Sequence, residues 1–329
     1  MMNRPRITST PQQGAALLAA LLTVALVTTL AAGAVWQQWR GLEVESAERH
    51  RAQARWLLLG SLDWARVILR EDALADGNQT PTDHLAEPWA VPLQEARLSS
   101  FLAALPDGTG GDSEDVALSE QVFLSGQIVD LQSRMTLLNL VQGDRVVPSS
   151  LLTFERLFET LGLPPDQLRL LTQGLLKAQS QQGAVLPQRV NQLTWFGLSA
   201  QTVARLSPYV NLLPSATPVN VNTASASVLY ASVPGLSLSE AQRLVQERTR
   251  SHWPTMEAFE KAIGKRSVSS STHSVNTRYF EVTGKLRTPS TTVTERSVLQ
   301  RDGRELKVLW RESGQWASAP TQPLAASLQ

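Results

Sequence analysis

A long apolar stretch lies near the start of the chain. Residues 7–39 contain no charged side chain, and residues 15–35 are 21 consecutive apolar or small residues. As a helix this run is about 31 Å long at about 1.5 Å per residue, which matches a hydrocarbon core of about 30 Å. Trp36 and Trp39 follow it, where aromatic rings favour the membrane interface. The pattern predicts one transmembrane helix over residues 15–35.

Basic residues precede the apolar stretch. Arg4 and Arg6 favour a cytoplasmic N-terminus, which places the rest of the chain across the membrane. A cleaved signal peptide and an uncleaved anchor without further chemistry are alternative interpretations. The length of the stretch, and the lack of a small-x-small site before a polar start, argue against the signal peptide.

Amphipathic periodicity continues after the tryptophans. Leu58, Leu62, Ala65 and Leu69 are spaced by four, three and four residues, which places them on one helical face. Charged residues supply the other face, and the turn residues of 76–78 end the pattern. We therefore expect residues 36–75 to continue the first helix.

The remaining chain alternates between loop, strand and helix patterns. Residues 76–120 predict mostly loop with a short helix near 94–104, and alternation over residues 122–131 predicts a strand. Strands are also expected at 279–287, 291–300 and 305–311, with Asp302 and Gly303 forming the last hairpin turn. Helical patterns dominate between these strand regions, at residues 149–162, 166–177, 199–206, 224–231, 238–250 and 255–263. Thr223 is positioned to cap the helix that follows it.

Composition narrows the chemistry that the chain can carry. The 329 residues include no cysteine and four scattered histidines, and the net charge is +1. Disulfides and thiolate metal sites are therefore excluded, and no histidine spacing predicts a metal site or an enzyme. Four acidic residues among glycines could supply oxygen ligands for calcium, although a solvated acidic loop is the better interpretation: Asp107, Asp112, Glu114 and Asp115.

The boundary between the polar start and the apolar stretch carries a motif. Gly14 stands there, followed by Ala-Ala-Leu-Leu. This resembles the leader of type IV pilins and type II secretion pseudopilins, in which a prepilin peptidase cuts after the glycine and methylates the new amine. The resemblance implies cleavage between Gly14 and Ala15, with the apolar helix retained. Most pilins carry glutamate at the fifth mature position, which is Ala19 here, and the K-type minor pseudopilin lacks that glutamate.

Two further motifs resemble the head of K-type minor pseudopilins. One is the strand S-G-Q-I-V-D-L-Q at residues 125–132, with Asn139 after it, and the other is V-N-V-N-T-A at residues 219–224. Asp130, Gln132 and Asn139 lack an accompanying base or nucleophile, so we expect them to tie down turns. The second motif also resembles helix-hairpin-helix modules that bind DNA. Ser237 replaces the second glycine of their turn, and Glu240 and Glu247 offset nearby arginines, which argues against a phosphate site.

The resemblance covers nearly the whole chain and implies an α+β fold. A pilin-like transmembrane and spine helix would precede a small antiparallel sheet, into which an all-α, SAM-like and helix-hairpin-helix-like domain is inserted. The expected organisation is a cytoplasmic prepilin leader (1–14), a transmembrane helix (15–35), its amphipathic continuation (36–75), loop and first strand (76–148), the inserted α-domain (149–275), C-terminal strands (276–313) and a flexible tail (314–329).

The implied function is that of a minor pseudopilin in a type II secretion system. It would join I-type and J-type minor pseudopilins in a tip complex that initiates and caps the pseudopilus, together with the major pseudopilin and after prepilin peptidase processing. Such a subunit is anchored in the bacterial inner membrane with its head in the periplasm, needs no cofactor, binds no nucleic acid and catalyses nothing. The alternatives are a membrane-anchored pilus or DNA-uptake subunit that binds DNA, and a periplasmic hydrolase.

Overall fold

Helix α1 (Gln13–Ala75) begins the described part of the chain and is 63 residues long. The computed structural model describes residues 13–75, 81–103, 121–180, 185–264, 266, 268–289 and 291–314. Contacts divide the chain into two units, Met1–Trp56 and Leu57–Gln329. The apolar stretch and the amphipathic stretch are thus both helical, as predicted.

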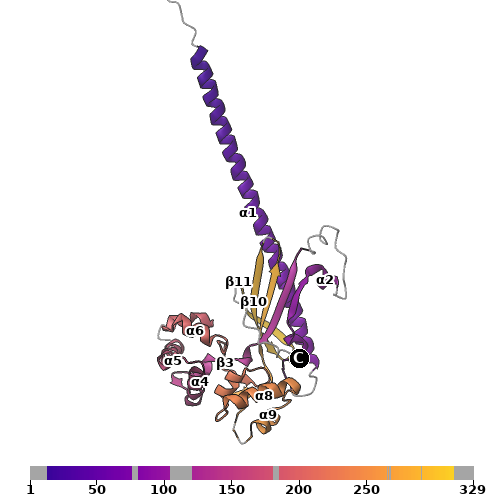
Figure 1. The fold of residues 1–329 in the computed structure, drawn as a ribbon, viewed down its shortest axis with the longest axis vertical. Helices are drawn as coiled ribbons and strands as arrows, with labels where there is room; N and C mark the ends of the chain where they lie inside the picture. Colours follow the sequence, from indigo (N-terminus) through magenta and orange to yellow (C-terminus); the bar gives the residue numbers. More distant parts are fainter. Residues whose placement is uncertain are drawn as a thin grey trace, which may run out of the picture. The chain divides into compact units, whose positions relative to one another are not determined.

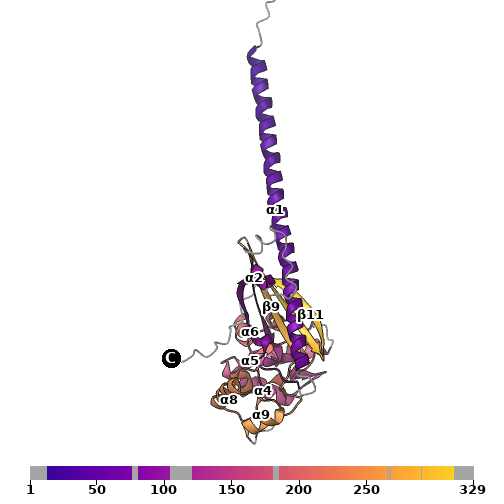
Figure 2. The ribbon, with the colours of Figure 1, turned by 90° about the vertical axis from the view of Figure 1, so that its right-hand side faces the viewer.

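A five-stranded antiparallel sheet forms one half of the second unit. Its strand order is β1-β2-β9-β10-β11, and in both views the C-terminal part of α1 lies along one face (Figures 1 and 2). The strands are β1 (Leu93–Arg97), β2 (Phe123–Asp130), β9 (Tyr279–Arg287), β10 (Thr292–Asp302) and β11 (Glu305–Gly314). Gly303 has a φ of 57° in the β10–β11 hairpin, in agreement with the predicted turn.

The apolar stripe of α1 and the alternating residues of the strands form the core of this half. Leu62, Ala65 and Leu69 pack with Phe280 and Leu299 of the sheet. Gly284 permits the close approach, since a Cβ there would lie 3.0 Å from Leu58 Cδ2. The predicted helical face is therefore the face that is buried.

The segment before β2 differs from its prediction. Residues 94–104 were expected to form a short helix within loop, but the structure has strand β1 followed by helix α2 (Leu98–Ala103). Leu93 to Arg97 pair with β2 through a register shift. Tertiary pairing has overridden a weak local pattern, as is usual for an edge strand. The short 3-10 helix η1 (Pro88–Ala90) precedes β1.

The second half is a helical domain inserted between two neighbouring strands. The chain leaves the sheet at the end of β2 and returns as β9, which pairs antiparallel with β2 from Phe123↔Arg287 to Asp130↔Phe280. Its helices are α4 (Pro148–Thr160), α5 (Pro165–Gln179), α6 (Ala200–Leu206), α7 (Ala226–Ser232), α8 (Leu238–Arg250) and α9 (Met256–Ile263). Every helix predicted between residues 149 and 263 is present.

Short elements connect these helices. They are the 3-10 helices η2 (Leu131–Ser133), η3 (Leu137–Leu140) and η4 (Val190–Phe196), and the two-residue strands β3 (Met135–Thr136), β4 (Val141–Gln142), β5 (Arg145–Val146), β6 (Val210–Asn211), β7 (Val219–Asn220) and β8 (His273–Ser274). Strand β3 pairs parallel with β6, and β7 with β8. None of these short elements was predicted, because the two-residue strands and the short 3-10 helices are too short to show a clear periodicity.

The aromatic ring of Phe196 packs directly against the backbone of Gly174 in α5. A Cβ at Gly174 would lie 2.2 Å from Cγ of Phe196, whereas a Cβ at Gly60 of α1 would meet nothing within 4 Å. Both glycines lie inside helices, where alanine is ordinarily the better residue. The two positions therefore respond oppositely to the same change.

We expect Gly174→Ala to lower the free energy of unfolding by about 1–3 kcal/mol, because the Phe196 ring must leave its site. Gly60→Ala should raise that free energy by about 0.5–1 kcal/mol. Chemical denaturation of the full chain in detergent micelles measures both. Equal effects of the two substitutions would show that the Phe196 ring is not seated on Gly174.

Candidate functional site

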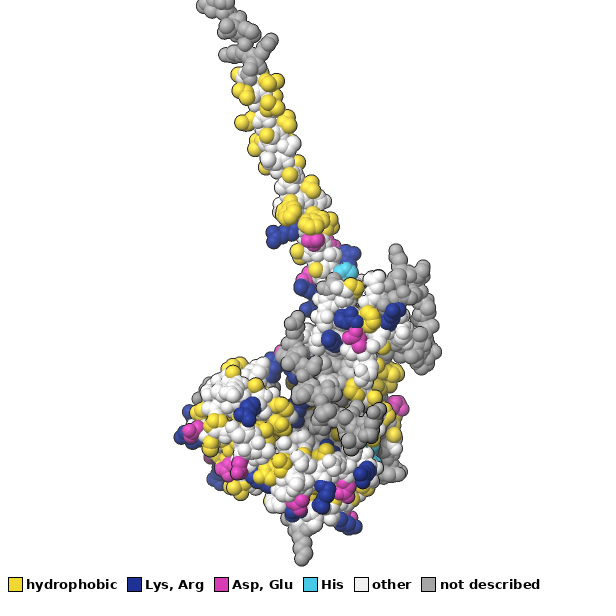
Figure 3. Space-filling view, in the orientation of Figure 1, with side chains coloured by type: hydrophobic (Ala, Val, Ile, Leu, Met, Phe, Trp, Pro, Cys, Tyr) yellow, Lys and Arg dark blue, Asp and Glu magenta, His cyan; other side chains and the backbone are white. Residues whose placement is uncertain are grey.

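The N-terminal unit presents an apolar helix surface. Every residue from Ala15 to Arg51 is exposed, including Leu22 at 70% and Leu30 at 66%. Figure 3 shows hydrophobic and uncharged side chains over the first turns, with charged side chains only further along. Within the described residues α1 is the one helix long and apolar enough to cross a membrane, with a mean hydropathy of 2.3 over an 18-residue window.

The polar groups of this stretch are satisfied within the helix. The hydroxyls of Thr23, Thr28 and Thr29 donate to backbone carbonyls three or four residues earlier, at 2.8–2.9 Å. A helix without unsatisfied polar groups is what lipid requires. Trp36 and Trp39 lie together at its end, with ring centroids 5.6 Å apart.

The residues expected at the processing site lie at the start of α1. Gly14 is within the helix bounds, and Ala15 and Ala19 have exposed side chains. Residues 1–12 of the expected leader lie outside the described residues, and so do Asp107, Asp112, Glu114 and Asp115 of the acidic loop.

In the head, the two sequence motifs meet at one buried carboxylate. Asp130 ends β2, and its Oδ2 accepts hydrogen bonds from Asn220 Nδ2 at 2.9 Å and Thr223 Oγ1 at 2.5 Å. Its Oδ1 accepts from the Gln132 amide at 2.6 Å. Asp130, Asn220 and Thr223 are 0–4% exposed, and we call these three residues the junction network. It joins the sheet to the inserted domain.

Burial sets the electrostatics of the junction network. It raises the pKa of Asp130 to about 6, while the hydrogen bond from Thr223 opposes the shift. Arg248 of α8 lies close by and donates from Nη1 to the Val221 carbonyl at 2.7 Å. Burial lowers the pKa of Arg248 to about 10, against the opposing charge of Asp130.

Neighbouring amides extend the junction network in both directions. Gln132 donates to the Pro218 carbonyl and accepts from the Arg278 amide, and Asn139 exchanges two hydrogen bonds with Thr217. Asp130 therefore caps the turn η2 through the Gln132 amide, in agreement with the prediction, and Gln132 and Asn139 in addition join segments that are distant in the sequence. Thr223 does not cap the next helix as expected, because its hydroxyl serves Asp130, and Ser225 caps α7 instead.

A second buried cluster holds the end of α1 to the sheet. Arg301 of β10 donates from Nη1 to Asp72 Oδ2 at 3.0 Å and from Nη2 to both oxygens of Asp83, at 2.5 and 2.6 Å. Asp83 also accepts from the Thr277 amide at 2.7 Å. Ion pairs between distant segments leave no periodic signal, so sequence reasoning missed this cluster.

The helix-hairpin-helix-like turn between α7 and α8 is satisfied by the chain's own side chains. The Ser237 amide donates to Glu240 Oε2 at 2.9 Å. Hydrogen bonds from this amide, from the Ser237 hydroxyl and from Arg266 lower the pKa of Glu240 to about 2. Arg156 donates to the carbonyls of Val233 and Leu236, at 2.7 and 2.8 Å. A phosphate would have to displace the Glu240 carboxylate from the amide that it needs.

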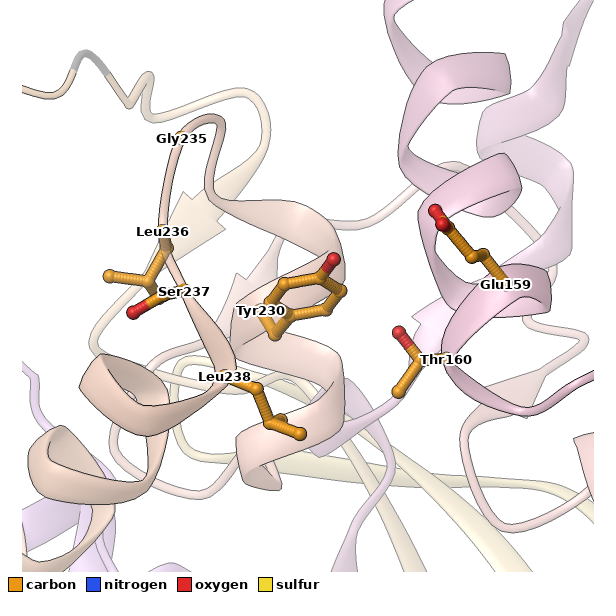
Figure 4. Close-up of a pocket in the computed structure, with 7 residues that line it drawn as sticks. All are labelled: Glu159, Thr160, Tyr230, Gly235, Leu236, Ser237 and Leu238. Carbon is orange, nitrogen blue, oxygen red and sulfur yellow. The ribbon is translucent and has the colours of Figure 1, made fainter.

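Figure 4 shows the shallow cleft beside this turn. Tyr230 lies between Gly235–Leu238 on one side and Glu159 and Thr160 of α4 on the other. The guanidinium of Arg156 lies 4.5 Å from the centre of the Tyr230 ring. The cleft is lined mainly by apolar groups and an acidic side chain, which are unlike a nucleic-acid contact surface.

An apolar N-terminal helix whose C-terminal part packs on an antiparallel sheet is the architecture of a pilin-like, membrane-anchored protein. Comparison with known proteins gives the particular family. The model of the type II secretion system (T2SS), protein K family matches residues 219–278, which include the V-N-V-N-T-A motif.

Relatives match over almost the whole chain. Type II secretion system protein K of Pseudomonas aeruginosa is 31% identical over 334 residues, covering 92% of this chain and 93% of the relative. The protein of the same name from Klebsiella pneumoniae is 30% identical over 339 residues, covering 92% and 97%. The chain therefore belongs to the type II secretion system protein K family, the K-type minor pseudopilins.

A solved structure has the same fold. It is the GspK-GspI-GspJ complex from the type 2 secretion system of enterotoxigenic Escherichia coli, and it matches with a TM-score of 0.62 and 17% sequence identity. The match covers 82% of this chain and 99% of that chain. The pilin-like α+β fold with an inserted helical domain is thereby confirmed.

The junction network leads to a mutational prediction. Thr223→Val and Asp130→Asn each leave a buried polar group without its partner, which should cost about 1–3 kcal/mol of unfolding free energy. The double variant should lose less than the sum, with a coupling of about 0.5–3 kcal/mol. Denaturant titration of the four chains measures the coupling. Thr249→Val is the control, since its hydroxyl bonds only within α8. Additive losses would contradict the junction network.

Buried His273 predicts a pH dependence. The side chain is 1% exposed, and burial lowers its pKa from 6.5 to about 4. The unfolded chain therefore binds a proton at this histidine near pH 6.5, whereas the folded chain binds it only near pH 4. The free energy of unfolding consequently falls as the pH falls from 6.5 to about 4. Relative to His273→Gln, the wild-type chain should lose about 3 kcal/mol between pH 7 and pH 4. Parallel stability curves for the two chains would contradict this account.

Proposed function

We propose that this chain is the K-type subunit at the tip of a type II secretion pseudopilus, where it joins I-type and J-type minor pseudopilins to initiate and cap the fibre. The observation that carries the proposal is α1, whose exposed apolar surface continues without a break into a helix that helps to build the head. Family membership and the fold of the GspK-GspI-GspJ complex support it.

The proposed membrane topology follows from the charge pattern. Arg4 and Arg6 precede the apolar stretch and the first charged residue after it is Arg40, so the short N-terminus would stay in the cytoplasm. The helix would cross the bacterial inner membrane once and place the head in the periplasm. Prepilin peptidase would cut between Gly14 and Ala15, and the new amine would be methylated.

Ala19 supports a position at the tip. A glutamate at this mature position would neutralise the terminal amine of the subunit ahead, because a buried unpaired amine is costly. A subunit with no neighbour ahead has no such amine to neutralise. The proposed role is mechanical: it involves no catalysis, cofactor or nucleic acid, and the closed turn at Ser237 supports the last point.

The exposed face of α1 within the head fits a second helix. Trp64, Val67 and Leu74 are 40%, 42% and 38% exposed, and their spacing of three and seven residues aligns them in one stripe. Helices of the I-type and J-type subunits, and later of the major pseudopilin, would pack against this stripe. It is the surface on which the proposed function is tested.

Co-expression of the full chain with I-type and J-type subunits, followed by native mass spectrometry in detergent, tests the proposed function. A complex with one copy of each subunit is expected. Val67→Glu should weaken that complex at least about tenfold, because it places a charge in a helix contact. Leu152→Glu is the matched control, since Leu152 is 63% exposed on α4 of the inserted domain.

Two results would contradict the proposal. One is the absence of a three-subunit complex with the wild-type chain. The other is equal sensitivity to Val67→Glu and Leu152→Glu, which would show that α1 is not the contact surface.

A further inference from the structure

Two of the four histidines lie face to face in the head, although they are far apart in the sequence. The rings of His84 and His252 are stacked with centroids 3.8 Å apart and planes inclined by 17°. His84 belongs to the segment between α1 and β1, and His252 to the loop between α8 and α9. Both neighbourhoods are anchored, since Thr82 donates to the Pro254 carbonyl at 3.2 Å and Asn222 accepts from the Trp253 amide at 2.9 Å.

A tight turn brings a carboxylate to the same place. The Glu87 amide donates to the His84 carbonyl at 3.3 Å, which puts the two side chains on one side of the turn. Nε2 of His84 and Oε1 of Glu87 are 3.5 Å apart. Two ligands on one tetrahedral zinc ion, each about 2.1 Å from the metal, are separated by about 3.4 Å. The observed spacing fits two ligands of one ion as well as it fits a His–Glu ion pair.

The Glu87 carboxylate is held in this orientation by its other oxygen. Oε2 accepts from the His84 amide at 3.0 Å and from Trp89 Nε1 at 2.5 Å. Trp89 is 2% exposed and packs against Phe280 of the sheet. In metal sites, the side chains that bind the ion are usually held in orientation by hydrogen bonds from neighbouring groups. Oε1 is left facing the imidazole.

The charge around Glu87 favours a cation. Asp72, Asp83 and Glu87 have ligand oxygens within 4.8 Å of one another, and Arg301 is bonded to the first two.

We propose that His84, Glu87 and His252 bind a structural zinc ion that clamps the segment after α1 to the α8–α9 loop of the inserted domain. His84 Nε2 and Glu87 Oε1 supply two ligands in the positions they already occupy. His252 supplies a third by turning its ring out of the stack, and water completes the set. The ring proton of His84 moves from Nε2 to Nδ1, which ends the 3.3 Å hydrogen bond from the exposed Ala86 amide.

Zinc titration of the full chain in detergent micelles tests this site. The chain, freed of affinity tags and stripped with EDTA, is titrated calorimetrically with zinc chloride alone. One ion per chain is expected, with a dissociation constant below about 10 µM and a higher melting temperature in zinc. His84→Gln, His252→Gln and Glu87→Gln should each weaken binding at least about tenfold.

His50→Gln is the matched control, because His50 lies exposed on α1, and it should bind zinc as the wild type does. Melting curves without metal show that each variant is folded. The proposal is overturned if the wild-type chain binds no zinc, or if His84→Gln and His252→Gln bind it with wild-type affinity. It is also overturned if 1 mM calcium displaces the zinc, since the carboxylates alone would then form the site. None of these outcomes depends on the role at the pseudopilus tip.

Discussion

The apolar surface of α1 between residues 15 and 35 must be covered, and this constraint governs the rest of the molecule. Burial of apolar surface is worth about 25 cal/mol per Å², and none of these residues is buried within the chain. Lipid covers such a surface in a membrane, and neighbouring helices cover it in a fibre. The core of the head is formed by the C-terminal part of the same helix. The surroundings of residues 15–35 can therefore change from lipid to neighbouring helices while the fold of the head stays the same.

The head is built to hold that helix firmly. Apolar residues of α1 pack on the sheet, and Arg301 ties Asp72 at the end of the helix to Asp83 and to β10. The inserted domain is joined to the same sheet through Asp130, Asn220 and Thr223. Both connections are buried, hydrogen-bonded and charged. Breaking either one leaves an unpaired polar group inside the protein.

Much of this fold could be predicted from the sequence. The long helix, the four long strands β2, β9, β10 and β11, and the helices between residues 149 and 263 all carry periodic patterns, and each is present. Strand β1 could not be predicted, since pairing with β2 creates it rather than its own residues. The short strands β3 to β8 could not be predicted either, because a strand of two residues shows no alternation of polar and apolar positions.

The chemistry of the head was harder to foresee than its elements. The motifs around Asp130 and Thr223 were recognised separately, but the hydrogen bond between them depends on a fold that returns residue 223 to residue 130. Thr223 was predicted to cap the following helix because the sequence shows only its neighbours along the chain and not its contact with Asp130. The pairing of His84 with His252 and the contacts of Arg301 likewise join distant segments. Sequence spacing records neighbours along the chain, whereas these sites are made by neighbours in space.

Mass spectrometry of the chain purified from membranes tests the central claim most directly, since the apolar helix must survive maturation. In cells that contain prepilin peptidase, the account predicts a chain that has lost residues 1–14, begins with methylated Ala15 and remains in the membrane fraction. Cells without the peptidase should yield the intact N-terminus, and Gly33→Ala should be processed normally. A chain released into the periplasm without residues 15–35 would contradict the account.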